Sequence, residues 1–157
     1  MLKPALATLA VLMLSAGVAD AQVKRVGPPG PGISSVVVVP PGYGVVYVAG
    51  LTAGGAGAPI TPGMDTKAQS LIVFEKLKAA LAAEGLTFAD VTMMNVYLAG
   101  DPAKVGKMDA AGMNEAYRQY FGTPEQPNKP ARVTVQVAAL GSPITFVEIS
   151  LQAAKKP

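Results

Sequence analysis

The chain of 157 residues contains no histidine and no cysteine. These two absences exclude Ser-His-Asp and Cys-His catalysis, thiolate chemistry, disulfide bonds and zinc sites built from His or Cys. Any metal site would have to use clustered carboxylates, and the ten acidic residues are scattered along the sequence. We therefore expect no metal ion.

Tryptophan is also absent, and positive charge is sparse. The net charge is +3 and no basic run is longer than Lys155-Lys156, so the sequence does not favour a nucleic-acid partner. Arginine is the usual bidentate binder of carboxylates, and there are only three: Arg25, Arg118 and Arg132. We expect Arg118 to be a solvated helix position and Arg132 to be the candidate for an anion site.

The first 21 residues have the pattern of a secretory signal peptide. A basic start at Lys3 precedes a short apolar stretch from Ala5 to Leu14, and Ala19-Asp20-Ala21 is an A-x-A cleavage site. Cleavage would leave Gln22 as the first of 157 − 21 = 136 residues, enough for one domain. The sequence thus predicts a periplasmic or secreted protein with no membrane segment after cleavage; the alternative is an uncleaved N-terminal anchor.

Periodicity and turn residues divide the mature chain into a lead-in and one domain. Residues 22–35 are expected to be an extended Pro/Gly-rich lead-in, and residues 36–154 the folded domain. The expected strands are 36–39, 44–49, 91–98, 132–137 and 146–151, and the expected helices are 66–84 and 113–121. Thr66 with Gln69 fits a capping box, and Gly85 ends the first helix.

The order of these elements, β-β-α-β-α-β-β, predicts an α+β fold. Two helices can cover only one face of a mixed sheet, so the other face is either wet or packed against another subunit. That open face is predicted to be semi-polar, and a homo-oligomer that buries it is a reasonable expectation.

The last two expected strands alternate strictly between apolar and polar residues. A turn at Gly141-Ser142-Pro143 would join them as a hairpin, with Arg132, Thr134 and Glu148 on one side of the sheet. A guanidinium and a carboxylate on one side could hold a small carboxylate and a water molecule, with Thr134 as a further substrate contact.

Several motifs together resemble the reactive intermediate deaminase family (RidA, also called YjgF). They include the strand from Val45 to Gly50, and the more specific ones lie in the second half of the chain. These are Met113-Asn114-Glu115-Ala116-Tyr117, Pro130-Ala131-Arg132 and Val147-Glu148-Ile149. The resemblance runs from about Val36 to Ala153, which is most of the mature chain.

The resemblance implies a chorismate-mutase-like fold, a homotrimer with clefts between subunits, and hydrolysis of 2-imino acids to 2-oxo acids and ammonium without a cofactor. It implies that Arg132 binds the substrate carboxylate and that Glu148 activates water. Asn114 and the backbone of Gly50 would contact the substrate.

The sequence also departs from the family pattern. Ile33 stands where a tyrosine is usual, Ala49 replaces a serine, and the loop from Gly100 to Gly112 is long. Asn114 could instead cap the second helix, and Arg132 could be an edge arginine paired with an acid. The alternative function is a non-catalytic trimeric protein that binds small carboxylates or a protein partner.

Overall fold

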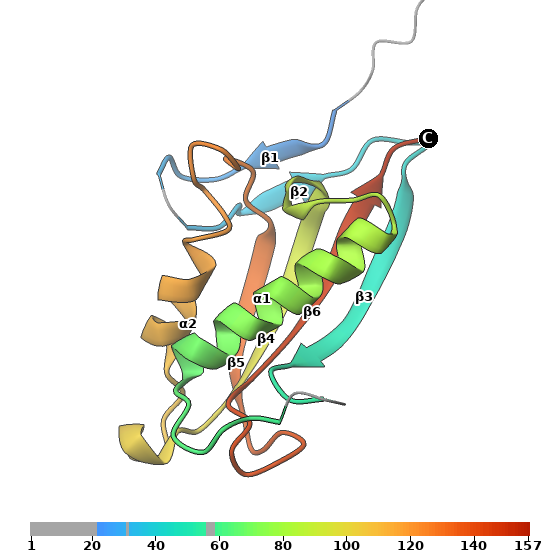
Figure 1. Cartoon of the computed structure of the whole chain (residues 1–157). Coiled ribbons are helices and arrows are strands. Elements are labelled where there is room, and N and C mark those ends of the chain that lie inside the picture. The colour runs from blue at the N-terminus through green and yellow to red at the C-terminus, as the bar shows by residue number, and fades with distance from the viewer. Residues whose placement is uncertain (1–21, 31, 56–58) are drawn as a thin grey trace, which may run out of the picture.

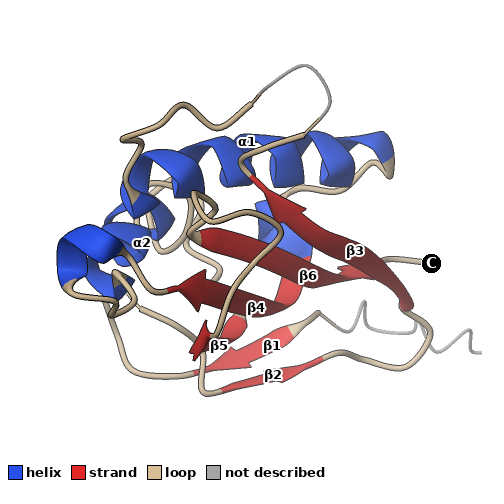
Figure 2. Cartoon of the chain, turned by 90° about the horizontal axis from the view of Figure 1, so that it is seen from below, coloured by secondary structure: helices blue, strands red, loops and turns tan. Residues whose placement is uncertain are grey.

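The computed structural model describes residues 22–30, 32–55 and 59–157, so the expected signal peptide lies outside the described part of the chain. Within those ranges no helix combines the length and the apolar character needed to cross a membrane. The fold consists of a four-stranded mixed sheet, a separate two-stranded sheet and two α-helices on the same side of the large sheet (Figures 1 and 2). The predicted α+β architecture, with both helices on one face, is confirmed.

The large sheet has the strand order β3-β6-β4-β5. Its strands are β3 (Gly44–Thr52), β4 (Val91–Ala99), β5 (Ala131–Val137) and β6 (Val147–Lys155). β6 is antiparallel to both of its neighbours, whereas β4 and β5 run parallel. The small sheet pairs β1 (Lys24–Val26) with β2 (Val36–Val38).

The helices are α1 (Thr66–Ala83) and α2 (Ala110–Tyr117), and two short 3₁₀ turns, η1 (Phe88–Asp90) and η2 (Pro102–Lys104), flank β4. Apolar side chains of α1 and α2 meet the inner face of β4 and β6 in one core. Phe74, Leu77 and Met94 are fully buried there, and the ring of Phe74 lies 4.9 Å from that of Tyr120. This core fixes the positions of α2 and β5, the two elements that carry the candidate site.

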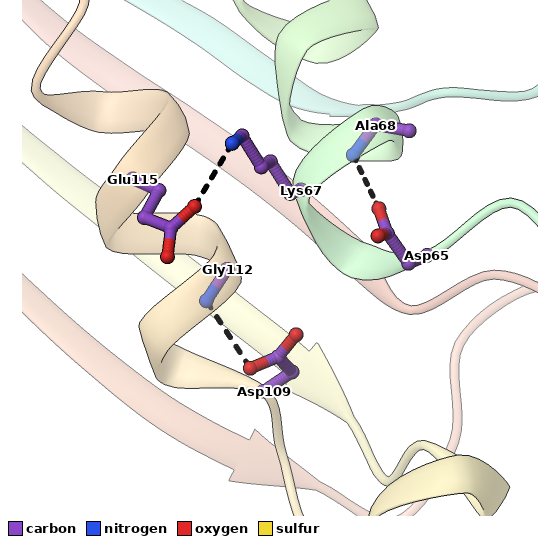
Figure 3. A network of polar contacts seen from close by, with 6 residues as sticks. All are labelled: Asp65, Lys67, Ala68, Asp109, Gly112 and Glu115. Atoms are coloured by element: carbon purple, nitrogen blue, oxygen red, sulfur yellow. Dashed lines mark hydrogen bonds and ion pairs between the residues drawn. The ribbon is translucent and has the colours of Figure 1, made fainter.

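Both helices begin at an aspartate that satisfies a free backbone N–H group (Figure 3). Asp65 accepts from Ala68 N at 2.8 Å, and Asp109 accepts from Gly112 N at 3.1 Å. The first helix therefore starts where predicted, but its cap is Asp65 and not Thr66. The second helix starts three residues earlier and ends four residues earlier than predicted, because Asp109 supplies the cap.

The predicted hairpin of the last two strands is wrong. β4 lies between β5 and β6, and each of the two pairs with β4 along most of its length. The chain from β4 through α2 to β5 is a β-α-β unit, which places the two strands parallel and adjacent. The segment after β5 must therefore cross β4 to reach β6.

The prediction that Arg132 and Glu148 share one face of the sheet is also wrong within one chain. Arg132 is level with Met94 and Thr134 with Val96, and these β4 residues face the helices. Glu148 is level with Tyr97, whose side chain points to the opposite, open face. Arg132 and Glu148 of one subunit hence lie on different sides of the sheet.

The lead-in is more ordered than predicted, because it contributes the strand β1. Arg25 on this strand donates from Nη2 to the carbonyl oxygens of Ala89 (2.7 Å) and Val91 (3.1 Å). These bonds hold β1 against the start of β4. The lead-in then continues to Ser34, whose backbone N–H donates to the Pro130 carbonyl at 2.9 Å, next to the site.

Candidate functional site

Arg132 lies near the start of β5, with its guanidinium above the ring of Tyr117 at 4.5 Å from the centroid. Its Nη2 donates to Asn114 Oδ1 at 2.7 Å, while its Nη1 is buried without a hydrogen-bond partner among the described residues. Burial lowers the pKa of Arg132, with the nearby Tyr117 opposing and Arg118 adding to this effect. An arginine nevertheless stays charged at neutral pH, so a half-buried cation whose Nη1 has no partner faces the space beside α2.

Asn114 is placed by α2, one turn into the helix, and does not cap it. Its side-chain oxygen accepts from Arg132, which leaves the guanidinium oriented by an amide and an aromatic face. The capping role that the sequence left open for Asn114 belongs to Asp109. No carboxylate pairs with Arg132 among the described residues, so the reading of Arg132 as an edge arginine paired with an acid is not supported.

Tyr117 connects this site to the lead-in. Its ring stacks on Phe121 at a centroid distance of 4.8 Å, and its hydroxyl donates to the carbonyl oxygen of Gly32 at 3.0 Å. Desolvation raises the pKa of Tyr117 to about 12, with Arg132 opposing the rise. The hydroxyl therefore keeps its proton at neutral pH and remains a donor to Gly32.

A cavity of about 200 Å³ opens at this point. Its lining consists of Gly32, Asn114, Tyr117, Arg118 and Arg132. The lining includes two cations and no acid, so the cavity favours a small anion. Sequence reasoning missed Arg118 as a member of this lining; its spacing from Asn114, one helical turn, is the signal that could have found it.

Glu148 and Gly50 form the second group of predicted residues, on the open face. Glu148 is half-buried on β6, level with Thr52 of β3. A Cβ at position 50 would overlap the Glu148 carboxylate, so only glycine leaves that carboxylate its present position. The structure thus brings Gly50 and Glu148 together but separates both from Arg132.

Thr134 lies two residues along β5 from Arg132 and on the same, helix-facing side. Its hydroxyl is buried without a partner, but it does not line the cavity. No cluster of three or more His, Cys, Asp or Glu side chains that could hold a metal ion occurs within the described residues.

Known proteins resemble this chain over most of its folded domain. The family model described as Endoribonuclease L-PSP matches residues 35–155. A RutC family protein of Pyrococcus horikoshii is 39% identical over 92 residues, which are 59% of this chain and 64% of that protein. The match thus spans a little under two thirds of that relative's length.

Solved structures share the same fold. A protein of unknown function of the conserved Rid protein family from Yersinia pestis superposes with a TM-score of 0.66 at 25% identity, covering 83% of this chain and 97% of that one. E. coli TdcF, solved with bound serine, gives a TM-score of 0.59 at 28% identity and covers 81% and 94% of the two chains.

Proposed function

The chain belongs to the endoribonuclease L-PSP family, and on that premise we propose that it hydrolyses 2-imino acids to 2-oxo acids and ammonium. The observation that carries the proposal is the buried, unpaired Nη1 of Arg132 in a small cavity whose charged groups are all positive. A carboxylate is the ligand that would satisfy it. E. coli TdcF was solved with bound serine, and serine is a 2-amino acid that also carries a carboxylate.

Arg132 would bind and orient the substrate carboxylate. Asn114 takes one hydrogen of Nη2 and Tyr117 supports the guanidinium plane, so the remaining donors keep a fixed direction. A fork held in this way can form two parallel hydrogen bonds to a carboxylate and thereby fix the adjacent imine carbon.

Glu148 would act on the water. The oxygen of water bonds to the imine carbon as the C=N double bond becomes single, and one water proton passes to the Glu148 carboxylate. Glu148 then returns this proton to the nitrogen of the tetrahedral adduct. The adduct collapses to a C=O group as the C–N bond breaks, and the proton of its hydroxyl group passes through Glu148 to the departing ammonia. Starting from the protonated imine, the products are the 2-oxo acid and ammonium. Positioned acid–base groups of this kind typically contribute ~10²–10⁴-fold.

The two residues would have to come from neighbouring subunits. Arg132 and Glu148 lie on different sides of one sheet, so one chain cannot place both on a single substrate. A homotrimer with its sites in the clefts between subunits removes this conflict. It would also cover the exposed apolar side chains of the open face, namely Val45, Tyr47, Val133 and Val135.

Imine hydrolysis accounts for the residues better than RNA cleavage does. The chain contains no histidine for acid–base cleavage of a phosphodiester and has a net charge of only +3. The cavity at Arg132 is also small, about 200 Å³, which suits a single small metabolite.

A coupled assay tests the proposal. An L-amino-acid oxidase generates the imine, semicarbazide traps it as a semicarbazone, and an active deaminase lowers the rate of semicarbazone formation. We expect the wild-type protein to suppress the semicarbazone and Arg132→Ala to leave it unchanged. Equal suppression by both proteins would contradict the assignment of Arg132.

A non-catalytic carboxylate-binding protein is the second candidate. Ile33, an apolar residue that packs against the core, stands beside the cavity residue Gly32 where the resemblance leads one to expect a tyrosine. Calorimetric binding of 2-oxo acids through Arg132, with no effect on the semicarbazone, would favour this candidate.

A further inference from the structure

Two guanidinium groups line the same small cavity. Arg132 is half-buried, and Arg118, the residue that follows the last turn of α2 as its C-cap, is exposed. The two are close enough for the charge of Arg118 to lower the pKa of Arg132. Like charges placed together disfavour each other, so such a pair costs free energy unless a ligand compensates it.

Glu115, an acid close enough to be influenced by the charge of Arg118, already has another partner. Glu115 feels the positive charge of Arg118, but its carboxylate binds Lys67 Nζ at 2.9 Å across the two helices (Figure 3). Arg118 itself makes no side-chain hydrogen bond or ion pair within the described ranges. One substrate carboxylate satisfies Arg132 and leaves Arg118 as an uncompensated cation at the mouth.

We infer that this cavity selects 2-imino acids whose side chain carries a second carboxylate, and that Arg118 is the specificity residue that binds it. The inference rests on the proposed function, because Arg132 is taken to hold the first carboxylate. The cavity has room for such a ligand: 200 Å³ corresponds to roughly seven water volumes of about 30 Å³ each. The class comprises the imines formed by oxidation of acidic amino acids.

Equilibrium binding of stable product analogues tests the inference without requiring turnover. The matched pair is 2-oxoglutarate and 2-oxopentanoate, which share a five-carbon chain and differ in the terminal carboxylate. For the assembled wild-type protein, calorimetry should give about fivefold tighter binding of 2-oxoglutarate, the size expected for a partly exposed ion pair. A higher salt concentration should reduce this preference, because the charge of Arg118 is exposed and is screened by ions.

Variants assign the preference to one side chain. Arg118→Gln should lower the affinity for 2-oxoglutarate to that of 2-oxopentanoate and leave the latter unchanged. Arg118→Lys should keep part of the preference, since it keeps the charge but not the planar fork. Lys78→Gln, which removes an exposed positive charge from α1 outside this cavity, is the matched control and should keep the full preference.

The outcomes separate this inference from the proposed function. Equal affinity of the wild type for both 2-oxo acids, or a preference that survives Arg118→Gln, would overturn the inference even if imines are hydrolysed. A preference that depends on Arg118 in a protein without deaminase activity would support the inference and contradict the proposed function. Melting temperatures of the Arg118 variants would show whether a change in affinity reflects loss of the fold instead.

Discussion

Arg132 is held from two sides by neutral groups. The Asn114 amide oxygen accepts one of its hydrogens at 2.7 Å, and the Tyr117 ring lies 4.5 Å from its central carbon. Neither neighbour neutralises the positive charge of Arg132. In a structural ion pair buried in a core, by contrast, a carboxylate would neutralise it. This arrangement supports our proposal that Arg132 binds an anionic ligand.

Conservative replacement of Arg132 should still impair the protein. Lysine keeps the positive charge but cannot form two parallel hydrogen bonds to a carboxylate. It also lacks the planar group with which arginine can bind Asn114 and a substrate at the same time. We expect Arg132→Lys to raise the dissociation constant for 2-oxo acids by at least about tenfold, the equivalent of one charge-assisted hydrogen bond. Titration calorimetry measures this, and an unchanged affinity would show that the carboxylate binds elsewhere.

A substitution at Gly50 can move the Glu148 carboxylate without altering its charge. A Cβ at position 50 would overlap that carboxylate, which can rotate away because it is the end of a flexible side chain. Gly50→Ala should therefore change the melting temperature little and lower kcat by up to about 100-fold, the cost of a misplaced catalytic group.

Gly141→Ala is the control for that substitution, because a Cβ at position 141 meets no atom within 4 Å. We expect its kcat to equal that of the wild type. A Gly50→Ala protein with normal kcat would show that Glu148 does not act from its present position.

At the scale of elements, α1 stabilises the end of β3 through one lysine. Lys76 Nζ donates to the carbonyl oxygens of Thr52 (3.0 Å), Ala53 (2.8 Å) and Gly54 (2.8 Å). Thr52 is the residue level with Glu148 on the neighbouring strand. The ammonium group thus fixes the segment that borders the Glu148 carboxylate.

Lys76→Met should remove these three bonds while keeping the apolar stem of the side chain. We expect a loss of about 2 kcal/mol in the free energy of unfolding, since bonds to a charged group contribute about 1.5–3 kcal/mol and water replaces part of them. Urea denaturation measures the loss. Lys78→Met, on the exposed side of the same helix, should leave the stability within about 0.5 kcal/mol of the wild type; equal effects of both would refute the role of the carbonyl contacts.

The sequence predicted the type of each major element but not the order of the strands. Alternation in residues 132–137 shows which side chains share a face, and it contains no information on which strand lies next to which. The signal that was available is the helix between residues 91–98 and 132–137, because a β-α-β unit places its strands parallel and adjacent.

Hydrophobicity could not predict which side chains of β5 face the helices. Apolar side chains of a strand usually face the core, and this edge strand has the opposite arrangement. Its polar residues point toward the helices, where Tyr117 covers Arg132 and Gln136 accepts from Met108 N. Its valines point to the open face, where Val133 is 41% and Val135 40% exposed. In one chain this arrangement leaves apolar surface in water, which is typical of an interaction surface.

At the scale of the whole molecule, export remains a prediction from residues 1–21. The basic start, the short apolar stretch and Ala19-Asp20-Ala21 predict cleavage before Gln22. Mass spectrometry of the protein purified from its native host should find Gln22 at the N-terminus. An intact Met1 in the soluble cytoplasmic fraction would contradict export.

The central claim is that each site combines Arg132 of one subunit with Glu148 of a neighbour in a trimer. Light scattering should first give about three times the monomer mass. Arg132→Ala and Glu148→Gln should each abolish or strongly reduce imine hydrolysis when assembled alone. Either variant keeps the residue that the other lacks, so a mixed trimer contains one intact site if the two residues act across subunits.

The most direct test is therefore to co-express the two variants with different tags, purify the mixed trimers and measure suppression of the semicarbazone. Each mixed trimer has one intact site in three, so the purified mixed trimers should regain about a third of the wild-type activity. Random assembly in equal amounts makes about three quarters of the trimers mixed, so the unpurified population should regain about a quarter. No recovery in mixed trimers, with both variants folded and trimeric, would contradict a site shared between subunits.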